Sequence, residues 1–201
     1  MKADNHSFLM MKSGTVRIMK VLFLMRLLSC RVVSFIVPGT GLVSRDKAVQ
    51  VVIFEHTSLG TGGLVLNRPT PIRLRDLQIP RFEVFENHTL MHGGHGTEES
   101  SSSNVPIGDM APWFWLHCND VISNSFRLEG AAGPLFMGGN LDEAIELIQK
   151  DQLDPFTFKF FYKYRQWEGG ELEKEIEHAQ WTVSLQDPAE AVRPYSLPVF
   201  E

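Results

Sequence analysis

The sequence predicts a single α+β domain behind a basic N-terminal segment. Segments with the two-residue period of a strand outnumber segments with the period of a helix, and the two kinds do not alternate regularly along the chain. Regular alternation is typical of a parallel doubly wound sheet, so this order favours the α+β class. The chain has 201 residues, of which 43% are hydrophobic, and this suits one hydrophobic core.

Two apolar strands and a proline-rich turn are expected early in the domain. Residues 49–54 form a β-branched run that predicts a buried strand, and the polar residues 55–58 predict a turn before a second strand at 63–66. Residues 67–71 are expected to end this strand, because proline donates no ladder hydrogen bond and restricts the residue before it. A short helix is expected at 72–77.

The middle of the chain predicts a loop, short strands and one helix. Residues 98–112 hold four serines and two prolines, which is typical of a solvated loop. Asn140 is a candidate N-cap, with Glu143 three residues later and apolar residues on one face of 141–148, so a helix is expected there. Short strands are expected between the loop and the helix, at 113–117, 126–128 and 134–137.

An aromatic strand is expected at 156–165. Aromatic residues from Phe156 to Tyr164 alternate with a mostly cationic set that includes Lys159 and Arg165, so the strand is predicted to have one aromatic and one mostly cationic face. Gly169 and Gly170 break the pattern. A helix with an inward Leu172 follows, and the last strand is expected at 181–185.

The termini are predicted to lie outside the domain. Residues 1–36 form a basic N-terminal extension or a transit peptide, residues 37–186 the domain, and residues 187–201 a tail with three prolines. With only two cysteines the chain suits an intracellular, reducing location, in a plastid or another organelle if the basic segment is a transit peptide and in the cytoplasm if it is not. The short apolar run of the basic segment is interrupted by Arg26, so no membrane span is expected.

Charge and cysteine content limit the classes of partner. Six of the 19 basic residues and one of the 24 acidic residues precede Pro38, which leaves 13 basic and 23 acidic residues from there onward. A domain with this excess of carboxylates repels phosphate, so direct binding of nucleic acid is not expected. Two cysteines cannot form a disulfide framework or a cysteine-rich metal site, and Cys118 is expected to be a buried thiol.

Two segments resemble the AlgH-like family. The first is Gly63-Leu64-Val65-Leu66-Asn67-Arg68-Pro69-Thr70, and the second runs from Tyr164 to Trp181 and combines an aromatic strand, a glycine-rich turn and a helix that ends in tryptophan. The resemblance covers about residues 47–185. It implies a curved, mainly antiparallel, partly barrel-like sheet flanked by helices, and it implies a regulatory connection but no catalytic activity. The second segment departs from the family pattern where Lys163, Arg165, Gln166 and Glu168 replace small residues, Gly169 replaces proline and Glu171 replaces glutamine.

The turn Asn67-Arg68-Pro69 is the first candidate site for a ligand or partner. The planar guanidinium of Arg68 offers paired donors to a carboxylate or phosphate. In the structural interpretation, Asn67 instead closes the turn and Arg68 pairs with a carboxylate of the domain. The second aromatic segment adds Trp167, Glu171 and Glu173 as further binding candidates.

Metal, cofactor and enzyme sites have weaker support in the sequence. His92 and His95, with His56 or His117, are too few clear ligands to predict zinc, so no metal and no cofactor are expected. A serine nucleophile motif and a phosphate-binding loop are both missing. The leading hypothesis is a non-catalytic regulatory or interaction protein, which binds an unknown protein or small molecule. The alternative is a hydrolase-like enzyme that uses Glu171, Glu173 and nearby histidines.

Overall fold

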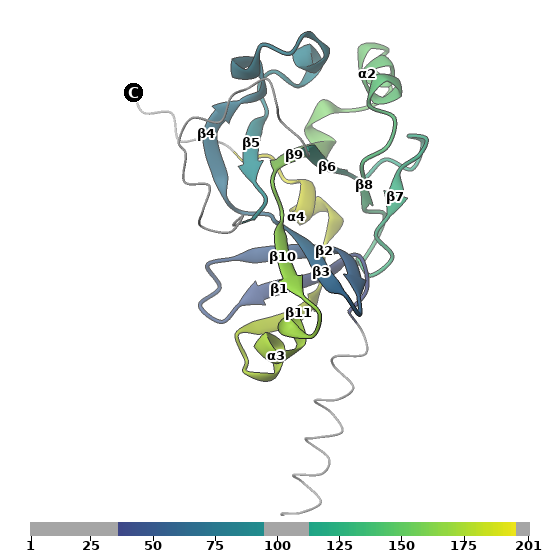
Figure 1. Ribbon diagram of the computed structural model, residues 1–201. Coiled ribbons are helices and arrows are strands. Elements are labelled where there is room, and N and C mark those ends of the chain that lie inside the picture. Colours follow the sequence, from purple (N-terminus) through teal and green to yellow (C-terminus); the bar gives the residue numbers. More distant parts are fainter. Residues whose placement is uncertain (1–35, 95–112, 196–201) are drawn as a thin grey trace, which may run out of the picture. The chain divides into compact units, whose positions relative to one another are not determined.

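The computed structural model describes residues 36–94 and 113–195 (Figure 1). Several features expected from the sequence lie outside these residues: nearly all of the basic N-terminal segment, the serine-rich loop at 98–112, and His95. Within the described residues the α+β class is confirmed, with two mainly antiparallel sheets and a few short helices. Neither sheet closes into a barrel in this part of the chain.

Sheet A contains five strands in the order β10-β3-β2-β1-β11, and each neighbouring pair is antiparallel. A bulge between Ile53 and Glu55 shifts the register of β2 against β3. The strands are β1 (Thr40–Ser44), β2 (Gln50–Thr57), β3 (Gly60–Val65), β10 (Arg165–Glu168) and β11 (Trp181–Leu185).

Sheet B contains six strands in the order β4-β5-β9-β6-β8-β7. The β5–β9 pair is parallel, and the other pairs are antiparallel. The strands are β4 (Pro69–Arg73), β5 (Thr89–His92), β6 (Trp113–His117), β7 (Phe126–Arg127), β8 (Phe136–Met137) and β9 (Phe158–Tyr162).

Short helices cover the outer faces of the two sheets, and one more helix lies in the layer between them. Helix α2 (Leu141–Gln149) begins at Asn140, whose side chain accepts a hydrogen bond from the Glu143 backbone amide, as the sequence predicts. The others are α3 (Glu171–Glu177), α4 (Pro188–Val192) and the 3₁₀ helices η1 (Leu74–Leu77), η2 (Pro80–Phe85) and η4 (Pro155–Thr157).

The core is arranged in layers because each strand alternates its side chains between two faces. In β2, Val52 and Phe54 pack with Phe161 of sheet B and with α4, so the two sheets share one apolar layer. Val51 and Ile53 lie on the opposite face of the same strand and pack with residues of α3 and β11. Sheet B has its own outer layer, in which Phe158, Phe160 and residues of α2, η1 and η2 are buried together.

The aromatic segment predicted as one strand is two strands in different sheets. β9 belongs to sheet B and β10 to sheet A, and the chain passes from one sheet to the other at Lys163, whose φ is +62° (Figure 1). Gly93 and Gly94 pack so closely on the backbone of 163–165 that a Cβ on either would clash with it. The prediction of one cationic face was therefore wrong: Lys159 is buried, and Arg165 lies in the other sheet.

Parts of two predicted turns belong to strands instead, while β3 does end before Asn67 as expected. Residues 55–57 continue β2, so the hairpin turns only at Ser58 and Leu59, and β3 already starts at Gly60. Pro69 begins β4, which lies at the edge of sheet B, where a residue without a backbone donor leaves no ladder hydrogen bond unmade. Strands β1 and β5 were not predicted, because both are short and lack a clear apolar alternation.

The segment predicted to be a C-terminal tail contains helix α4. The Asp187 side chain accepts a hydrogen bond from the Ala189 backbone amide, and Pro188 occupies the first turn, so the helix has a regular N-terminus. Ala191 and Val192 are buried in the layer between the sheets. The prolines pointed to a tail, but here one of them starts a helix that completes the core.

Candidate functional site

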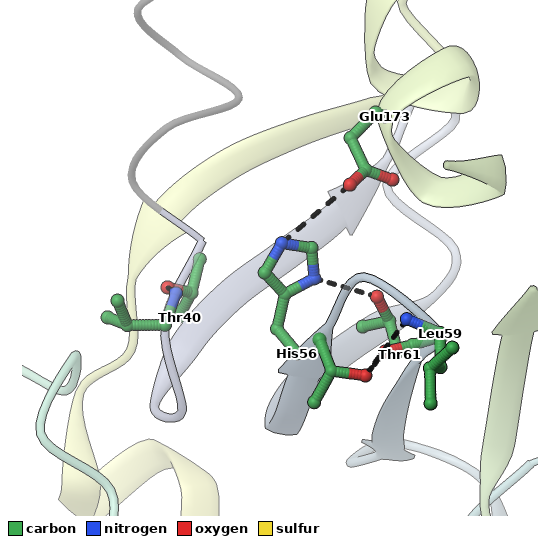
Figure 2. Close-up of polar contacts among 8 residues, drawn as sticks. Thr40, His56, Leu59, Thr61 and Glu173 are labelled. Carbon is green, nitrogen blue, oxygen red and sulfur yellow. Dashed lines mark hydrogen bonds and ion pairs between the residues drawn. The ribbon is translucent and has the colours of Figure 1, made fainter. Parts of the chain in front are cut away.

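A histidine, a threonine and a glutamate meet at the end of the β2–β3 hairpin beside α3 (Figure 2). His56 Nδ1 and Thr61 Oγ1 form a 2.8 Å hydrogen bond, and His56 Nε2 lies 3.7 Å from Glu173 Oε1. The order of contacts is therefore hydroxyl, imidazole, carboxylate. Thr61 is only 3% exposed, so this hydroxyl is not open to solvent.

One oxygen of Glu173 is buried without a hydrogen bond. Within the described residues, Glu173 Oε2 and Trp115 Nε1 are the buried side-chain polar atoms that have no partner. Leaving a carboxylate oxygen unmatched costs free energy, so the Glu173 side chain is held in place by its surroundings rather than by its own hydrogen bonds. Among the acidic side chains of α3, Glu173 is the one with a buried oxygen that lacks a hydrogen-bond donor in the described residues.

The tip of the same hairpin exposes a leucine. Leu59 is 89% exposed, the largest value among the exposed apolar residues of the described chain. Its turn packs against the turn before α3, since a Cβ on Gly169 would clash with the Ser58 carbonyl, and Gly60 pairs with Glu168. An apolar side chain in water therefore stands next to the acidic start of α3.

Glu175 organises the inner side of α3. Its Oε2 accepts hydrogen bonds from the indole nitrogens of Trp167 at 2.8 Å and Trp181 at 2.5 Å, and Arg165 Nη2 lies 3.4 Å away. The Arg165 guanidinium lies over both indole rings, 4.6 and 4.9 Å from their centroids. Burial lowers the pKa of Arg165, and the nearby Glu175 opposes this shift.

The predicted residues of the second segment therefore have different surroundings. Glu171 accepts a hydrogen bond from the Glu168 backbone amide and holds the turn before α3, while its side chain remains exposed. Trp167 is buried in the core, and its indole nitrogen donates a hydrogen bond to Glu175. Of the three candidates Trp167, Glu171 and Glu173, the structure places Glu173 next to a histidine, His56.

The Asn67-Arg68-Pro69 turn connects the two sheets. Asn67 accepts a hydrogen bond from the Gln50 backbone amide and donates one to the Ala48 carbonyl, so its side chain fastens the turn to the start of β2. Pro69 starts β4. Arg68 lies within electrostatic range of Arg165, which places the turn near β10 rather than beside Glu173.

His117, outside the hairpin, has structural surroundings. The imidazole of His117 lies between the rings of Phe136 and Phe158; its Nε2 donates to the Gly138 carbonyl and its Nδ1 accepts from the Asn119 amide. Burial lowers the pKa of His117, so a neutral ring fits this pattern. No group of three potential metal ligands occurs in the described part of the chain.

Cys118, next to His117, is a free thiol packed at the margin of the apolar layer between the sheets. Burial raises the pKa of this thiol, and Asp187 raises it further, so the reactive thiolate is disfavoured. Cys118 was expected to be a buried thiol, and the structure shows it partly buried, packed against the apolar layer.

The chain belongs to the AlgH-like family, whose model matches residues 46–196. The resemblance expected from the two motifs is thereby confirmed, and the match extends past the predicted domain boundary to include α4. A UPF0301 protein of Chlorobium chlorochromatii is 25% identical over 150 residues, covering 75% of this chain and 71% of the relative. A UPF0301 protein of Bacteroides fragilis is 28% identical, and the match spans 68% of this chain and 62% of that relative.

Solved structures share the fold at lower sequence identity. A Corynebacterium diphtheriae protein, DIP2367, superposes with a TM-score of 0.60 at 21% identity, over 81% of this chain and 82% of that one. The solution structure of the AlgH protein from Pseudomonas aeruginosa gives a TM-score of 0.54 at 20% identity, over 78% of this chain and 82% of that one. These similarities establish the AlgH-like fold for this chain.

The sequence did not point to two residues that matter for the site, Glu175 and Leu59. Neither residue was assigned a role from the sequence. Glu175 lies three residues after Leu172, so the two share the inward face of α3, and this spacing was the available signal. Leu59 carried no signal, because its exposure depends on the position of the hairpin turn.

Proposed function

We propose that this AlgH-like chain is a non-catalytic interaction protein with a regulatory role, which binds a basic protein partner. Its contact would be the hairpin–α3 surface, formed by Leu59, Glu168, Glu171 and Glu173. The observation that carries the proposal is Leu59, which is 89% exposed at the tip of a hairpin whose turn packs against the turn before the acidic first turn of α3. An apolar residue rimmed by charges of one sign suits a partner with an apolar pocket and a basic rim.

The surroundings of the other candidate groups favour binding over catalysis. Glu171 holds a turn, Glu175 is occupied by two indoles and a guanidinium, and His117 has a partner on each ring nitrogen. Groups engaged in this way stabilise the domain, and a general base needs a free, accessible position near a substrate. Exposed residues beside them remain available for contact.

The Asn67-Arg68-Pro69 turn stays in the proposal as a second contact, for an anionic group on the partner or for a small ligand. Arg68 carries the guanidinium, and Asn67 fixes the backbone from which it extends. Replacing Arg68 with alanine should weaken binding while the free energy of unfolding changes little. Loss of folding in this variant would assign the turn a purely structural role.

The main test compares two exposed apolar residues. A partner is first captured by cross-linking to the full chain and purified, and its dissociation constant is then measured with the wild type, Leu59→Asp and Val121→Asp. Val121 is 58% exposed and lies in the segment after β6, so it is the matched control. We expect Leu59→Asp to weaken binding about tenfold or more, since anchors at an interface centre carry most of the affinity.

Two results would contradict the interaction proposal. One is failure to capture any partner that binds as a purified protein. The other is equal loss of binding in Leu59→Asp and Val121→Asp, because the hairpin–α3 surface would then have no special role. Neither substitution touches the core, so circular dichroism should give the wild-type unfolding profile for both.

A hydrolase is the second candidate function. The chain of contacts from Thr61 through His56 to Glu173 favours it. A hydroxyl, an imidazole and a carboxylate in sequence form the arrangement that activates a hydroxyl nucleophile. A panel of esterase, phosphatase and glycosidase substrates tests it. Turnover that is lost in Glu173→Gln and retained in Glu171→Gln would replace the interaction proposal with this one.

The expected location and the excluded partners complete the proposal. We place the protein inside the cell, in an organelle if residues 1–36 are a transit peptide, and N-terminal sequencing of the native protein tests this. No helix in the described residues is long and apolar enough to cross a membrane. The excess of carboxylates from Pro38 onward argues against nucleic acid as the partner, and a gel shift that weakens steeply with salt would contradict that.

A further inference from the structure

A small cavity lies between sheet B and the chain that follows α4. Its volume is about 230 Å³, which is below the usual range for drug-sized ligands and suits a smaller molecule. Its apolar wall includes Met91, Phe156 and Phe158, and Pro194 and Tyr195 close one side. The segment after α4 therefore forms part of the cavity, and the hydrogen bond from Thr89 Oγ1 to the Tyr195 carbonyl joins it to β5.

The polar residues of this cavity are cationic or neutral. Lys159 and Arg73 line it together with His88, Asn87 and Thr89, and none of the residues lining it is aspartate or glutamate. This contrasts with the acidic excess of the domain from Pro38 onward. The lining therefore disfavours cations and offers two positive charges to an anion.

Lys159 is the unusual member of the set. It is 7% exposed, and its ammonium has no hydrogen bond or ion pair with any residue of the described ranges. Glu190 attracts it from α4, but that carboxylate is itself paired with Arg193. The Lys159 Nζ atom is not among the fully buried atoms of the described residues, so this ammonium keeps an opening while most of the side chain is out of water. An ammonium in such a position without an acceptor is costly to the folded chain, and an anion in the cavity would supply that acceptor.

We propose that this cavity, which Lys159 and Arg73 both line, is a binding site for a small organic carboxylate. Arg73 offers paired donors in a plane and Lys159 adds a point charge, a combination that matches one carboxylate group. The apolar wall would cover the body of the ligand. A free phosphate has no apolar body, so the wall selects against it.

Protonation of Lys159 gives the site a dependence on pH. Burial lowers the pKa of Lys159 to about 8; Glu190 opposes this shift and Arg193 adds to it. The other titratable groups that face the cavity are Arg73, His88 and Tyr195. At pH 7 the Lys159 ammonium is mostly protonated and can bind an anion, whereas well above pH 8 it is neutral.

The experiment titrates the full chain with benzoate, acetate and inorganic phosphate at pH 7, by calorimetry and by NMR of the backbone amides. We expect benzoate to bind most tightly and to shift the amides of Thr89 and Tyr195. Lys159→Met should weaken benzoate binding about tenfold or more, which is the effect of losing one charge-assisted hydrogen bond. The matched control is Lys150→Met, since Lys150 is exposed and pairs with Glu146.

Arg73→Gln gives a second variant at the cavity, and it should weaken benzoate binding by a similar factor. In the wild type, affinity should fall as the pH is raised from 7 to above 9, and in Lys159→Met it should not change over that range. Equal benzoate affinity in the wild type and Lys159→Met would overturn the proposal. So would the absence of benzoate binding, or tighter binding of phosphate than of benzoate.

Discussion

Glu175 in α3 and Lys159 in β9 are both charged side chains drawn into the protein, and their surroundings are opposite. Glu175 accepts hydrogen bonds from two indoles and lies beside a guanidinium, so its charge is shared among three donors. Lys159 has no hydrogen-bond acceptor within the described residues and faces a cavity instead. The Glu175 carboxylate connects α3 to β10 and β11, whereas the N–H donors of Lys159 have no acceptor in the described residues.

The comparison shows how a buried charge can be assigned a role from its partners. A carboxylate whose oxygens are matched by donors from the same domain contributes to folding, and a ligand would have to compete with those donors. An ammonium without acceptors weakens the fold and gains most when an anion arrives. The fold can therefore be tested at Glu175 and ligand binding at Lys159.

The largest expected effect is at Glu175. Replacing it with alanine leaves two indole N–H groups and Arg165 without their acceptor, and we expect the free energy of unfolding to fall by about 4 kcal/mol. Urea denaturation measures this. Glu177→Ala is the control on the same helix; it is exposed and should change stability by less than about 0.5 kcal/mol. Equal effects of the two substitutions would remove the distinction between Glu175 and an ordinary surface carboxylate.

The next effect has the opposite sign. Lys159→Met removes a buried charge and keeps the length of the side chain, so we expect it to stabilise the ligand-free protein at pH 7. Because the pKa of Lys159 is lowered from 10.5 to about 8, the expected gain is about 3 kcal/mol. Below pH 8 the folded and unfolded chains both carry the proton, so the full penalty applies.

The pH dependence of stability sharpens this test. Between pH 8 and pH 10.5 the unfolded chain still binds the Lys159 proton and the folded chain does not, so the free energy of unfolding of the wild type should rise with pH. Lys159→Met should lack this contribution to the rise. A Lys159→Met variant less stable than the wild type at pH 7 would mean that the ammonium has an acceptor.

A smaller effect is expected at Arg165. Arg165→Lys keeps the positive charge near Glu175 but loses the flat group that lies over Trp167 and Trp181. We expect a loss of about 1–2 kcal/mol of stability in urea denaturation, because stacking on an indole needs the planar guanidinium. Lys174→Arg on the exposed face is the reciprocal control and should be neutral. A neutral Arg165→Lys would assign the contact to charge alone.

Elements with a complete local signal could be predicted from the sequence. Helix α2 begins at Asn140 as its capping pattern indicates, and β6 has the bounds that the run Trp113 to His117 predicts. The class of fold followed from the order of such elements. These predictions needed only residues close together in the chain, where local hydrogen bonds and periodicity decide the outcome.

The division of the aromatic segment could not be predicted in this way. Its alternation is regular from Phe156 to Tyr164, yet the break at Lys163 depends on Gly93 and Gly94, about 70 residues earlier in the chain. Helix α4 was missed for a different reason: Asp187 and Pro188 give it a local N-terminal signal, but the three prolines after Gln186 were interpreted as a tail.

The candidate site was predictable only in part. Glu173 was named and does reach a histidine, whereas the link between His56 and Thr61 requires the hairpin to turn at Ser58, which the polar residues 55–58 concealed. Lys159 looked like a solvated residue on a cationic face. Its burial depends on α4, so the cavity could not be recognised without the three-dimensional arrangement.

The passage of the chain from β9 to β10 couples the two sheets mechanically. Strand β9, which contains Lys159, is joined by only two residues to β10, which contains Trp167 in sheet A. The connection between the two strands can be followed in Figure 1. If a ligand in the cavity stabilises β9, amide hydrogen exchange should slow in β9 and, through this short connection, in β10 as well. Occupancy of a site in one sheet could then be read at the surface of the other.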